Sequence, residues 1–335
     1  MKILVTGGAG YIGSFMVREL KEKGHSVVIV DNLSGGHPEA VKDFDLQKID
    51  LVTEKQKLDE LFQKEKFDGV VHMASFIQMG ESFNNPSKYY RNNVVGYLNL
   101  MDTMIENNCL NLIISSSAGV YGNPERVPIE EDDLKNPLNP YGETKYILER
   151  VADDYDLAYG LKYMSFRYFN ASGASLDGTI GEAHMEESHL IPNIIVKALN
   201  NQEVEIFGND YETTDGTCVR DYIHVLDLVE VHEMGLQSLV KNKKSNVYNV
   251  GLGRGYSNNQ IIEEIERLSN LKVNVKYGPR REGDANELYA SNEKLKKDFN
   301  WSPKYDIEKI IETALLWHKT NPNGYKTHPK GYNQV

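Results

Sequence analysis

Cysteine is scarce in this sequence, and long apolar runs are absent. Among 335 residues only Cys109 and Cys218 are cysteines, too few for a disulfide framework or a cysteine-rich metal site. No apolar run approaches the roughly 18 residues of a membrane span, and the run near the amino terminus covers only residues 3–5. We therefore expect a soluble protein in a reducing, cytoplasmic compartment.

Positive charge is also in short supply. Lysine and arginine total 37 against 49 aspartates and glutamates, which gives a formal net charge of -12. A chain of this sign is not drawn to nucleic acid or to an anionic membrane. Any anionic small ligand must then be bound by a few arginines and by helix N-termini.

Short β-branched runs alternate with longer helical patterns in the first half of the chain. The predicted strands cover 2–6, 26–30, 68–74, 111–117 and 162–168, and the predicted helices lie near 11–23, 54–66, 86–107 and 141–159. This alternation is typical of a parallel sheet with helices on both faces. The predicted fold class is α/β, a doubly wound parallel sheet of Rossmann type with a second, smaller α+β domain.

After residue 171 the sequence becomes glycine-rich and more irregular. We predict that 1–171 form the sheet domain, with 221–252 returning to it, and that 172–220 and 253–325 form the smaller domain. Residues 326–335 are polar and are expected to form a tail.

A glycine-rich turn follows the first predicted strand. Gly7, Gly10 and Gly13 stand between that strand and a predicted helix, where glycines let the backbone approach a pyrophosphate at the helix N-terminus. Asp31 ends the second predicted strand, close to the roughly 20-residue spacing of a carboxylate that binds the adenosine ribose. Because a carboxylate repels a 2′-phosphate, the predicted cofactor is NAD rather than NADP.

Tyr141 and Lys145 lie one turn apart on a predicted helix. A tyrosine that acts as a base near pH 7 needs its pKa lowered by about 3 units, roughly 4 kcal/mol. A nearby lysine ammonium favours the phenolate. Ser115, Ser116 and Ser117 end the fourth predicted strand at the carboxyl edge of the sheet, where ligands bind in such folds, and a hydroxyl there can share a proton with the tyrosine.

Six segments carry a resemblance that spans Lys2 to about Tyr325. TGGAGYIGS, SSSAGVYG, PYGETK, RYFNASGA, FGNDYETTDGTCVRDYIHV and PRREGD together resemble the extended short-chain dehydrogenase/reductase family. Within that family the last two segments are similar to the nucleotide-sugar 4-epimerases that interconvert UDP-glucose and UDP-galactose.

The resemblance implies a role for each catalytic residue. Tyr141 would be the base, Lys145 would lower its pKa and hold the nicotinamide ribose, and Ser117 would orient the 4-hydroxyl of a UDP-hexose. NAD would stay bound, and the net change would be inversion at C4. The implied NAD contacts are Gly7, Gly10, Tyr11, Ile12, Gly13, Asp31, Asn32, Asp50, Leu51, Met73, Ala74, Ser75, Asn93, Ser115, Tyr141, Lys145 and Phe169.

The resemblance also implies a substrate set, with departures from the family pattern. The implied contacts are Ser117, Asn170, His189, Leu190, Phe207, Arg220, Arg281, Asp284 and Leu288. Ile77 stands where some relatives carry lysine, and His189 where several carry asparagine. Leu288 falls at a position that gates N-acetylated sugars, and its intermediate size predicts partial tolerance of UDP-GlcNAc beside UDP-glucose and UDP-galactose.

Several alternatives stay open. His184, Glu186, Glu187 and His189 lack the HExxH spacing, so we predict a polar helix start there and no metal. A 4,6-dehydratase needs an extra acid pair after the serine region, where this chain has Ala118-Gly119-Val120. A UDP-glucuronate epimerase or decarboxylase, and a non-catalytic NAD-binding regulator, are further candidates.

The resemblance also implies a homodimer paired through the helices at 86–107 and 141–159. The apolar side chains of Val95, Leu98, Met101 and Met104 suit packing on the chain's own sheet equally well.

Overall fold

The structure, a computed structural model, describes residues 1–184, 187–281 and 284–326. The contacts between residues divide the chain into two units. Unit 1 comprises Met1–Gly122, Lys135–Arg167 and Val229–Tyr248, and unit 2 comprises Asn123–Leu134, Tyr168–Leu228 and Asn249–Val335. From residue 327 on, the tail predicted for 326–335 lies outside the described residues.

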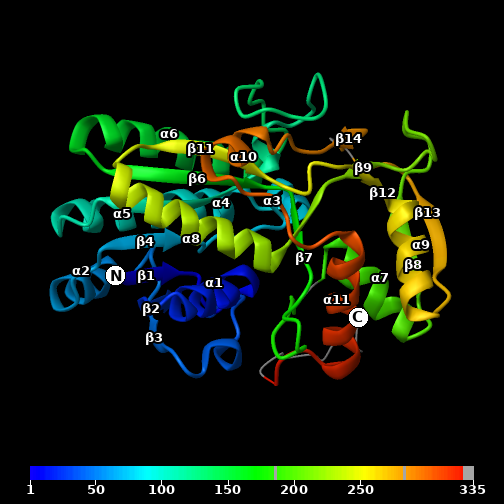
Figure 1. Cartoon of the computed structure of the whole chain (residues 1–335), viewed down its shortest axis with the longest axis horizontal. Coiled ribbons are helices and arrows are strands. Elements are labelled where there is room, and N and C mark those ends of the chain that lie inside the picture. The colour runs from blue at the N-terminus through cyan, green and yellow to red at the C-terminus, as the bar shows by residue number, and fades with distance from the viewer. Residues whose placement is uncertain (185–186, 282–283, 327–335) are drawn as a thin grey trace. The chain divides into compact units, whose positions relative to one another are not determined.

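Seven strands form the main sheet in the order β11-β6-β5-β4-β1-β2-β3 (Figure 1). They are β1 (Lys2–Thr6), β2 (Ser26–Asp31), β3 (Asp45–Lys48), β4 (Gly69–His72), β5 (Asn111–Ser117), β6 (Lys162–Tyr168) and β11 (Asn246–Val250). The pairs β1–β2, β1–β4, β2–β3 and β4–β5 are parallel. The predicted doubly wound Rossmann-type fold is confirmed.

The central strands β1 and β4 are almost entirely buried, as expected where helices cover both faces of a sheet. Helices α2 (Lys55–Lys64), α5 (Gly96–Glu106) and α6 (Pro140–Tyr159) pack on one face, in one buried cluster with Leu4 and Val28. On the other face, α1 (Tyr11–Glu22) packs on β1 and β2, and α8 (Val225–Asn242) packs its Gly235 against Phe166.

Shorter elements complete unit 1. They are η1 (Pro38–Val41), α3 (Met79–Asn84), α4 (Pro86–Tyr89), a π-helical segment (Tyr90–Val95) and η3 (Ala118–Val120). The single helix predicted for 86–107 is therefore α4, the π-helical segment and α5 in sequence. A π-helical insertion of this kind often marks a functional site.

Unit 2 mixes short strands with helices. Its strands are β7 (Asn170–Ser172), β8 (Glu203–Phe207), β9 (Val219–Arg220), β10 (Tyr222–His224), β12 (Tyr256–Ser257), β13 (Asn274–Gly278) and β14 (Glu287–Leu288). Its helices are α7 (Leu190–Leu199), α9 (Asn258–Ser269), α10 (Glu293–Phe299) and α11 (Ile307–Thr320). The apolar faces of α7, α9 and α11 meet in one core that includes Ile195, Ile265 and Ile310.

The segment 123–134 groups with unit 2, whereas the sequence analysis placed it in the first domain. The N–H of Ile129 donates to the carbonyl of Tyr289 at 2.9 Å, and the N–H of Ser291 donates to the carbonyl of Ile129 at 2.8 Å. These two bonds tie the segment to residues far along the chain, a pairing that local sequence does not encode. Within the described part of the chain, no helix combines the length and apolar character that crossing a bilayer requires.

Candidate functional site

The turn between β1 and α1 is closed so tightly that only glycine fits at two positions. Gly7 has a φ of 70°, and a Cβ there would lie 2.6 Å from the backbone nitrogen of Ala74. A Cβ on Gly13 would lie 2.1 Å from the carbonyl oxygen of Gly7. Gly10 precedes α1 without a side-chain cap. A helix start with no capping side chain leaves N–H groups for an anion, so this turn fits the pyrophosphate of a dinucleotide.

Asp31 lies at the carboxyl end of β2, beside this turn. Its Oδ2 accepts the N–H of Ala9 at 3.0 Å, and its Oδ1 accepts the N–H of Leu33 at 2.8 Å. Burial raises the pKa of Asp31, and these two hydrogen bonds oppose that rise. Each carboxylate oxygen keeps a second lone pair, so the group fits a ribose hydroxyl pair as the sequence predicts.

The other predicted NAD contacts in unit 1 follow the carboxyl ends of neighbouring strands. Asn32 donates from Nδ2 to Asp50 Oδ2 at 2.8 Å, which joins the ends of β2 and β3. Tyr11 and Ile12 begin α1, Leu51 comes after β3, and Met73, Ala74 and Ser75 come directly after β4.

Ser117 and Tyr141 are brought together by β5 and the first turn of α6. Asn139 caps α6 by accepting the N–H of Gly142 at 2.8 Å, which places Tyr141 at the helix start. A Cβ on Gly142 would lie 2.6 Å from the carbonyl oxygen of Gly119, so α6 approaches η3 through two glycines. Burial raises the pKa of Tyr141, and a hydrogen bond with the Ser117 side chain lowers it.

Lys145 is buried under this pair. Its Nζ donates to Ser75 Oγ at 2.8 Å, to the Ser115 carbonyl at 2.8 Å and to Ser115 Oγ at 3.1 Å. Its Nζ lies 5.9 Å from the centroid of the Tyr141 ring. Burial lowers the pKa of Lys145 to about 7. The structure therefore joins Lys145 with Ser75 and Ser115, and Tyr141 with Ser117.

Asn93 lies in the π-helical segment and is fully buried. Its Oδ1 accepts the N–H of Phe76 at 2.9 Å, and its Nδ2 donates to the carbonyl of Phe76 and to Thr144 Oγ1. The side chain thus fixes the segment after β4 to α6. The sequence analysis predicted it as an NAD contact, and the structure shows it positioning Ser75 and its neighbours.

A buried ion pair that was not predicted from the sequence contacts Ser116, the neighbour of Ser117. Glu149 Oε2 accepts from Arg167 Nη2 at 2.7 Å, and its Oε1 accepts from Ser116 Oγ at 2.6 Å. Arg167 Nη1 donates to the Tyr121 hydroxyl at 2.7 Å. The spacing of residues could have indicated Glu149. Tyr141, Lys145 and Glu149 are four residues apart in turn, so they share one face of α6.

Several of the predicted substrate contacts lie near one another in unit 2. Arg281 lies over the ring of Phe207 at 4.1 Å, and Arg220 Nη2 lies 3.4 Å from Asp284 Oδ1. Arg220 Nη1 also donates to two carbonyls, those of Val219 and Ala285, both at 2.9 Å. Strand β14 pairs with β9 so that Leu288 is opposite Arg220. Two guanidinium groups and an aromatic ring held in this way suit a nucleoside diphosphate.

The other predicted NAD and substrate contacts of unit 2 lie on β7, next to it, and at the start of α7. Asn170 is exposed on β7 and donates from Nδ2 to the carbonyl of Asp221 at 2.7 Å. Phe169 is buried, and its N–H donates to the carbonyl of Val250 at 3.1 Å. His189 is the N-cap residue of α7, and Leu190 begins that helix.

The predicted polar helix start is wrong, because α7 begins only at Leu190. Glu182, His184 and Glu187 precede it outside any helix, and they lie close to His189. Glu186 lies outside the described residues. The HExxH spacing brings two histidines to one ion only on a helix. Because this segment is not helical, the absence of that spacing does not exclude a metal site here.

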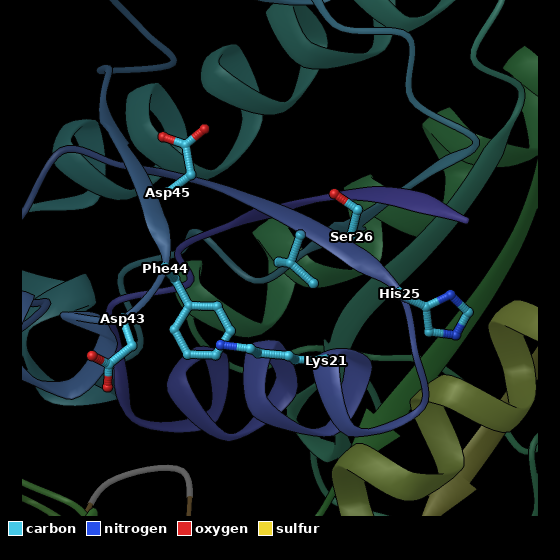
Figure 2. Close-up of a pocket in the computed structure, with 7 residues that line it drawn as sticks. Lys21, His25, Ser26, Asp43, Phe44 and Asp45 are labelled. Carbon is cyan, nitrogen blue, oxygen red and sulfur yellow. The ribbon is translucent and has the colours of Figure 1, made fainter.

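A small open pocket lies away from these residues (Figure 2). It is lined by Lys21, His25, Ser26, Val27, Asp43, Phe44 and Asp45. Lys21 Nζ lies 4.9 Å from the Phe44 ring centroid, over the ring. Ser26 and Asp45 begin β2 and β3, so the pocket is at the amino ends of these strands, whereas ligands of such sheets bind at the carboxyl ends.

Known proteins match this chain along most of its length. The sequence profile described as the NAD dependent epimerase/dehydratase family matches residues 3–251. The chain belongs to this family. A UDP-glucose 4-epimerase of Lactobacillus helveticus is 43% identical over 334 residues, which cover 97% of this chain and 99% of the relative. The family predicted from the sequence motifs is confirmed.

Solved structures agree with that assignment. A crystal structure of UDP-glucose 4-epimerase from Brucella ovis in complex with NAD superposes with a TM-score of 0.91 at 43% identity, covering 94% of this chain and 97% of the other. The enzyme from Bifidobacterium longum in complex with NAD+ and UDP has a TM-score of 0.91 at 33% identity, covering 97% and 100%.

Proposed function

We infer that this chain is a UDP-glucose 4-epimerase that interconverts UDP-galactose and UDP-glucose with bound NAD. The observation that carries the inference is the arrangement of Ser117, Tyr141 and Lys145 at the carboxyl end of β5 and on the first turns of α6. The names of its full-length relatives support the same reaction.

The residues of unit 1 fit NAD. The turn at Gly7 and Gly13 admits a pyrophosphate, Asp31 fits the adenosine ribose, and Lys145 lies on the nicotinamide side with Ser115. NAD held by these residues would supply the hydride acceptor and donor for C4 of the sugar.

The residues of this chain handle the proton. Tyr141 takes the proton of the 4-hydroxyl as C4 is oxidised and returns it when C4 is reduced. Ser117 keeps Tyr141 and the sugar oxygen in register through its hydrogen bond to the phenol. The buried ammonium of Lys145 stabilises the phenolate. The outcome is inversion at C4 without net oxidation.

Unit 2 supplies the groups that bind the UDP moiety. Arg220 and Arg281 provide positive charge for the pyrophosphate in a chain of net charge -12. Binding through the diphosphate leaves the hexose free to turn over between the two half-reactions, which a tightly held sugar could not do. His189 and Leu190, at the start of α7, are proposed for the uracil side.

Leu288 is proposed to set the preference among sugars. It is half-buried on β14, opposite Arg220. A side chain of this size favours UDP-glucose and UDP-galactose and admits the N-acetylated sugars partly.

We also propose a cytoplasmic homodimer. Both cysteines are buried and unpaired, which suits a reducing compartment. Met101 and Met104 are fully buried in the core of unit 1, but Val95 is 42% exposed and Leu157 of α6 is 89% exposed. The exposed Val95, directly before α5, and Leu157 of α6 support a contact between two copies through the helical stretch from Tyr90 to the end of α5 and through α6.

The test is to incubate purified protein with UDP-galactose and follow the sugar by NMR. UDP-glucose as the product supports the proposal. A 4-keto-6-deoxy product would instead indicate a dehydratase, and turnover of UDP-glucuronate alone would indicate a different sugar class. The residues after Ser117, Ala118–Val120 in η3, carry no acid group for a dehydration.

A further inference from the structure

Two histidines and two glutamates converge just before α7, outside the groups that carry the proton transfer. Glu182, His184, Glu187 and His189 each offer one nitrogen or oxygen, and these four atoms all lie within 4.8 Å of one another. Imidazole nitrogens combined with carboxylate oxygens are a donor set that zinc binds in proteins.

The distances between these donors are close to those of a metal site. His184 Nδ1 lies 3.2 Å from Glu182 Oε1 and 3.3 Å from Glu187 Oε2, and His189 Nδ1 contacts the same oxygen of Glu182. Ligands at zinc distances in a tetrahedral site are about 3.3–3.5 Å apart. The 3.3 Å separation therefore matches and the 3.2 Å separation is only slightly short, whereas the His189–Glu182 contact must widen and a pair at the 4.8 Å limit must close by about 1.3–1.5 Å.

One oxygen in the cluster is left without a hydrogen bond. The Glu187 side chain is only 10% exposed, and its Oε2 has no hydrogen-bond partner among the described residues although it points toward His184. Apart from the approach of His184 Nδ1 at 3.3 Å, this oxygen has room for the direct contact that a bound cation would supply.

The charge of the cluster also suits a cation. Glu182 and Glu187 each carry a negative charge when ionised, and one divalent cation bound to two neutral imidazoles balances that charge. His318 of α11 also faces Glu182 and Glu187, but burial lowers its pKa to about 4, so it adds no charge near pH 7.

The cluster is held by a rigid support. Trp317 Nε1 of α11 donates to the carbonyl of Glu182 at 2.8 Å, and a Cβ on Gly181 would lie 2.4 Å from the Trp317 ring. Glu182 is thereby fixed on α11, and His189 is fixed as the N-cap residue of α7. A bound ion would cross-link these two helices.

We propose that Glu182, His184, Glu187 and His189 form a binding site for one divalent zinc ion. The site shares His189 with the proposed uracil contacts, but zinc binding itself requires neither NAD nor a sugar. Zinc binds only the neutral form of a histidine, so binding releases the protons that the two imidazoles carry.

Calorimetric titration of the metal-stripped protein with zinc chloride tests the proposal. In two buffers of different ionisation enthalpy, we expect one ion per chain, proton release, and a zinc affinity that rises about 10- to 100-fold per pH unit between about pH 6 and pH 7. His184→Gln and Glu182→Gln should abolish this binding. His25→Gln is the matched control, because His25 also pairs with a buried glutamate, Glu233, and lies outside the cluster.

Cobalt added to the unsubstituted protein gives a second readout that does not depend on how the variants fold. Visible absorption bands typical of four- or five-coordinate cobalt, lost on adding zinc, support the site. The absence of saturable zinc binding up to about 1 mM, a weak-binding limit, would overturn the proposal. Equal zinc binding by folded His184→Gln and Glu182→Gln proteins would overturn it as well.

Discussion

As the proposed base, Tyr141 must ionise in a place that opposes ionisation. Its ordinary pKa near 10 has to fall by about 3 units for it to act at pH 7, a change of roughly 4 kcal/mol. Burial raises the pKa of Tyr141, and the Ser117 hydrogen bond lowers it. In the proposed mechanism the ammonium of Lys145, whose Nζ lies 5.9 Å from the ring centroid, further favours the phenolate.

Removing the phenol oxygen should therefore stop the reaction. We expect Tyr141→Phe to lower kcat by about 10²–10⁴, the usual contribution of a general base, with the melting temperature and the amount of bound NAD nearly unchanged. Tyr146→Phe, on the same helix and outside the site, is the matched control and should keep the parent rate. A Tyr141→Phe enzyme within a few-fold of the parent would refute the assigned role.

Lys145 should make the stability of the protein depend on pH. Burial lowers its pKa from 10.5 to about 7, so between these values the unfolded chain holds a proton that the folded chain has lost. The free energy of unfolding must then rise with pH across this window because of this group. Lys145→Met removes the titration, and urea unfolding at several pH values should show the wild-type minus variant difference growing from about pH 7 toward pH 10. A difference that stays level would contradict the assigned pKa.

At the scale of elements, one face of α6 carries both the proposed catalytic residues and one member of a buried ion pair. Tyr141 and Lys145 lie at the site, and Glu149, one turn further, forms the buried pair with Arg167 of β6. The same pair reaches Ser116, directly before Ser117, so it also holds the end of β5.

Breaking this pair on one side should cost more than removing both charges. Glu149→Gln leaves Arg167 buried without a counter-charge, and we expect a loss of about 3–5 kcal/mol in the free energy of unfolding. Arg167→Met should cost a similar amount, and the double variant less than the sum of the two. Urea denaturation of the four proteins measures the coupling, and simple additivity would show that the pair acts as two separate residues.

The turn between β1 and α1 should tolerate no side chain at Gly13. A Cβ there meets the Gly7 carbonyl at 2.1 Å, so Gly13→Ala should lose bound NAD and about 1–3 kcal/mol of stability. Gly80→Ala in α3 meets nothing within 4 Å and is the control, expected to be neutral or slightly stabilising. Cofactor content measured after denaturation distinguishes the two, and a Gly13→Ala protein with full NAD content would argue against the assigned phosphate site.

The sequence predicts those elements whose signal is local. Strands such as 2–6 and 111–117, the glycine turn and the Tyr141–Lys145 face could all be read from residue spacing. Strand β3 (Asp45–Lys48) is short and polar, so it carries no apolar signal. The π-helical segment at Tyr90–Val95 and the partner of Arg167 depend on packing between elements distant in sequence.

At the scale of the whole molecule, the two units differ in how well their candidate site residues could be predicted from local sequence. In unit 1 most of these residues come directly after a strand, and the alternation of strand and helix patterns predicts where each strand ends. Those of unit 2 come from separate segments around Phe207, Arg220 and Arg281, and only pairing between β9 and β14 and the Phe207–Arg281 contact bring them together. Family resemblance, rather than periodicity, indicated these residues.

The proposed dimer predicts a surface that is sensitive to charge. We expect light scattering to give twice the chain mass of 38.0 kDa, and Val95→Asp to shift the protein toward monomer by placing a charge in an apolar contact. Leu176→Asp is the control, because Leu176 is 54% exposed on unit 2 and lies outside α5 and α6. A monomeric parent, or dissociation by both variants alike, would contradict the assigned surface.

In the proposed reaction C4 is oxidised and reduced with a cofactor that stays on the protein, while Tyr141 carries the proton. NMR of UDP-galactose labelled with deuterium at C4, incubated with the purified protein and no added cofactor, tests this. We expect UDP-glucose that retains deuterium at C4, because the hydride returns to the sugar from which it came. Loss of the label to solvent, or no reaction until NAD is supplied at each turnover, would refute the proposed reaction.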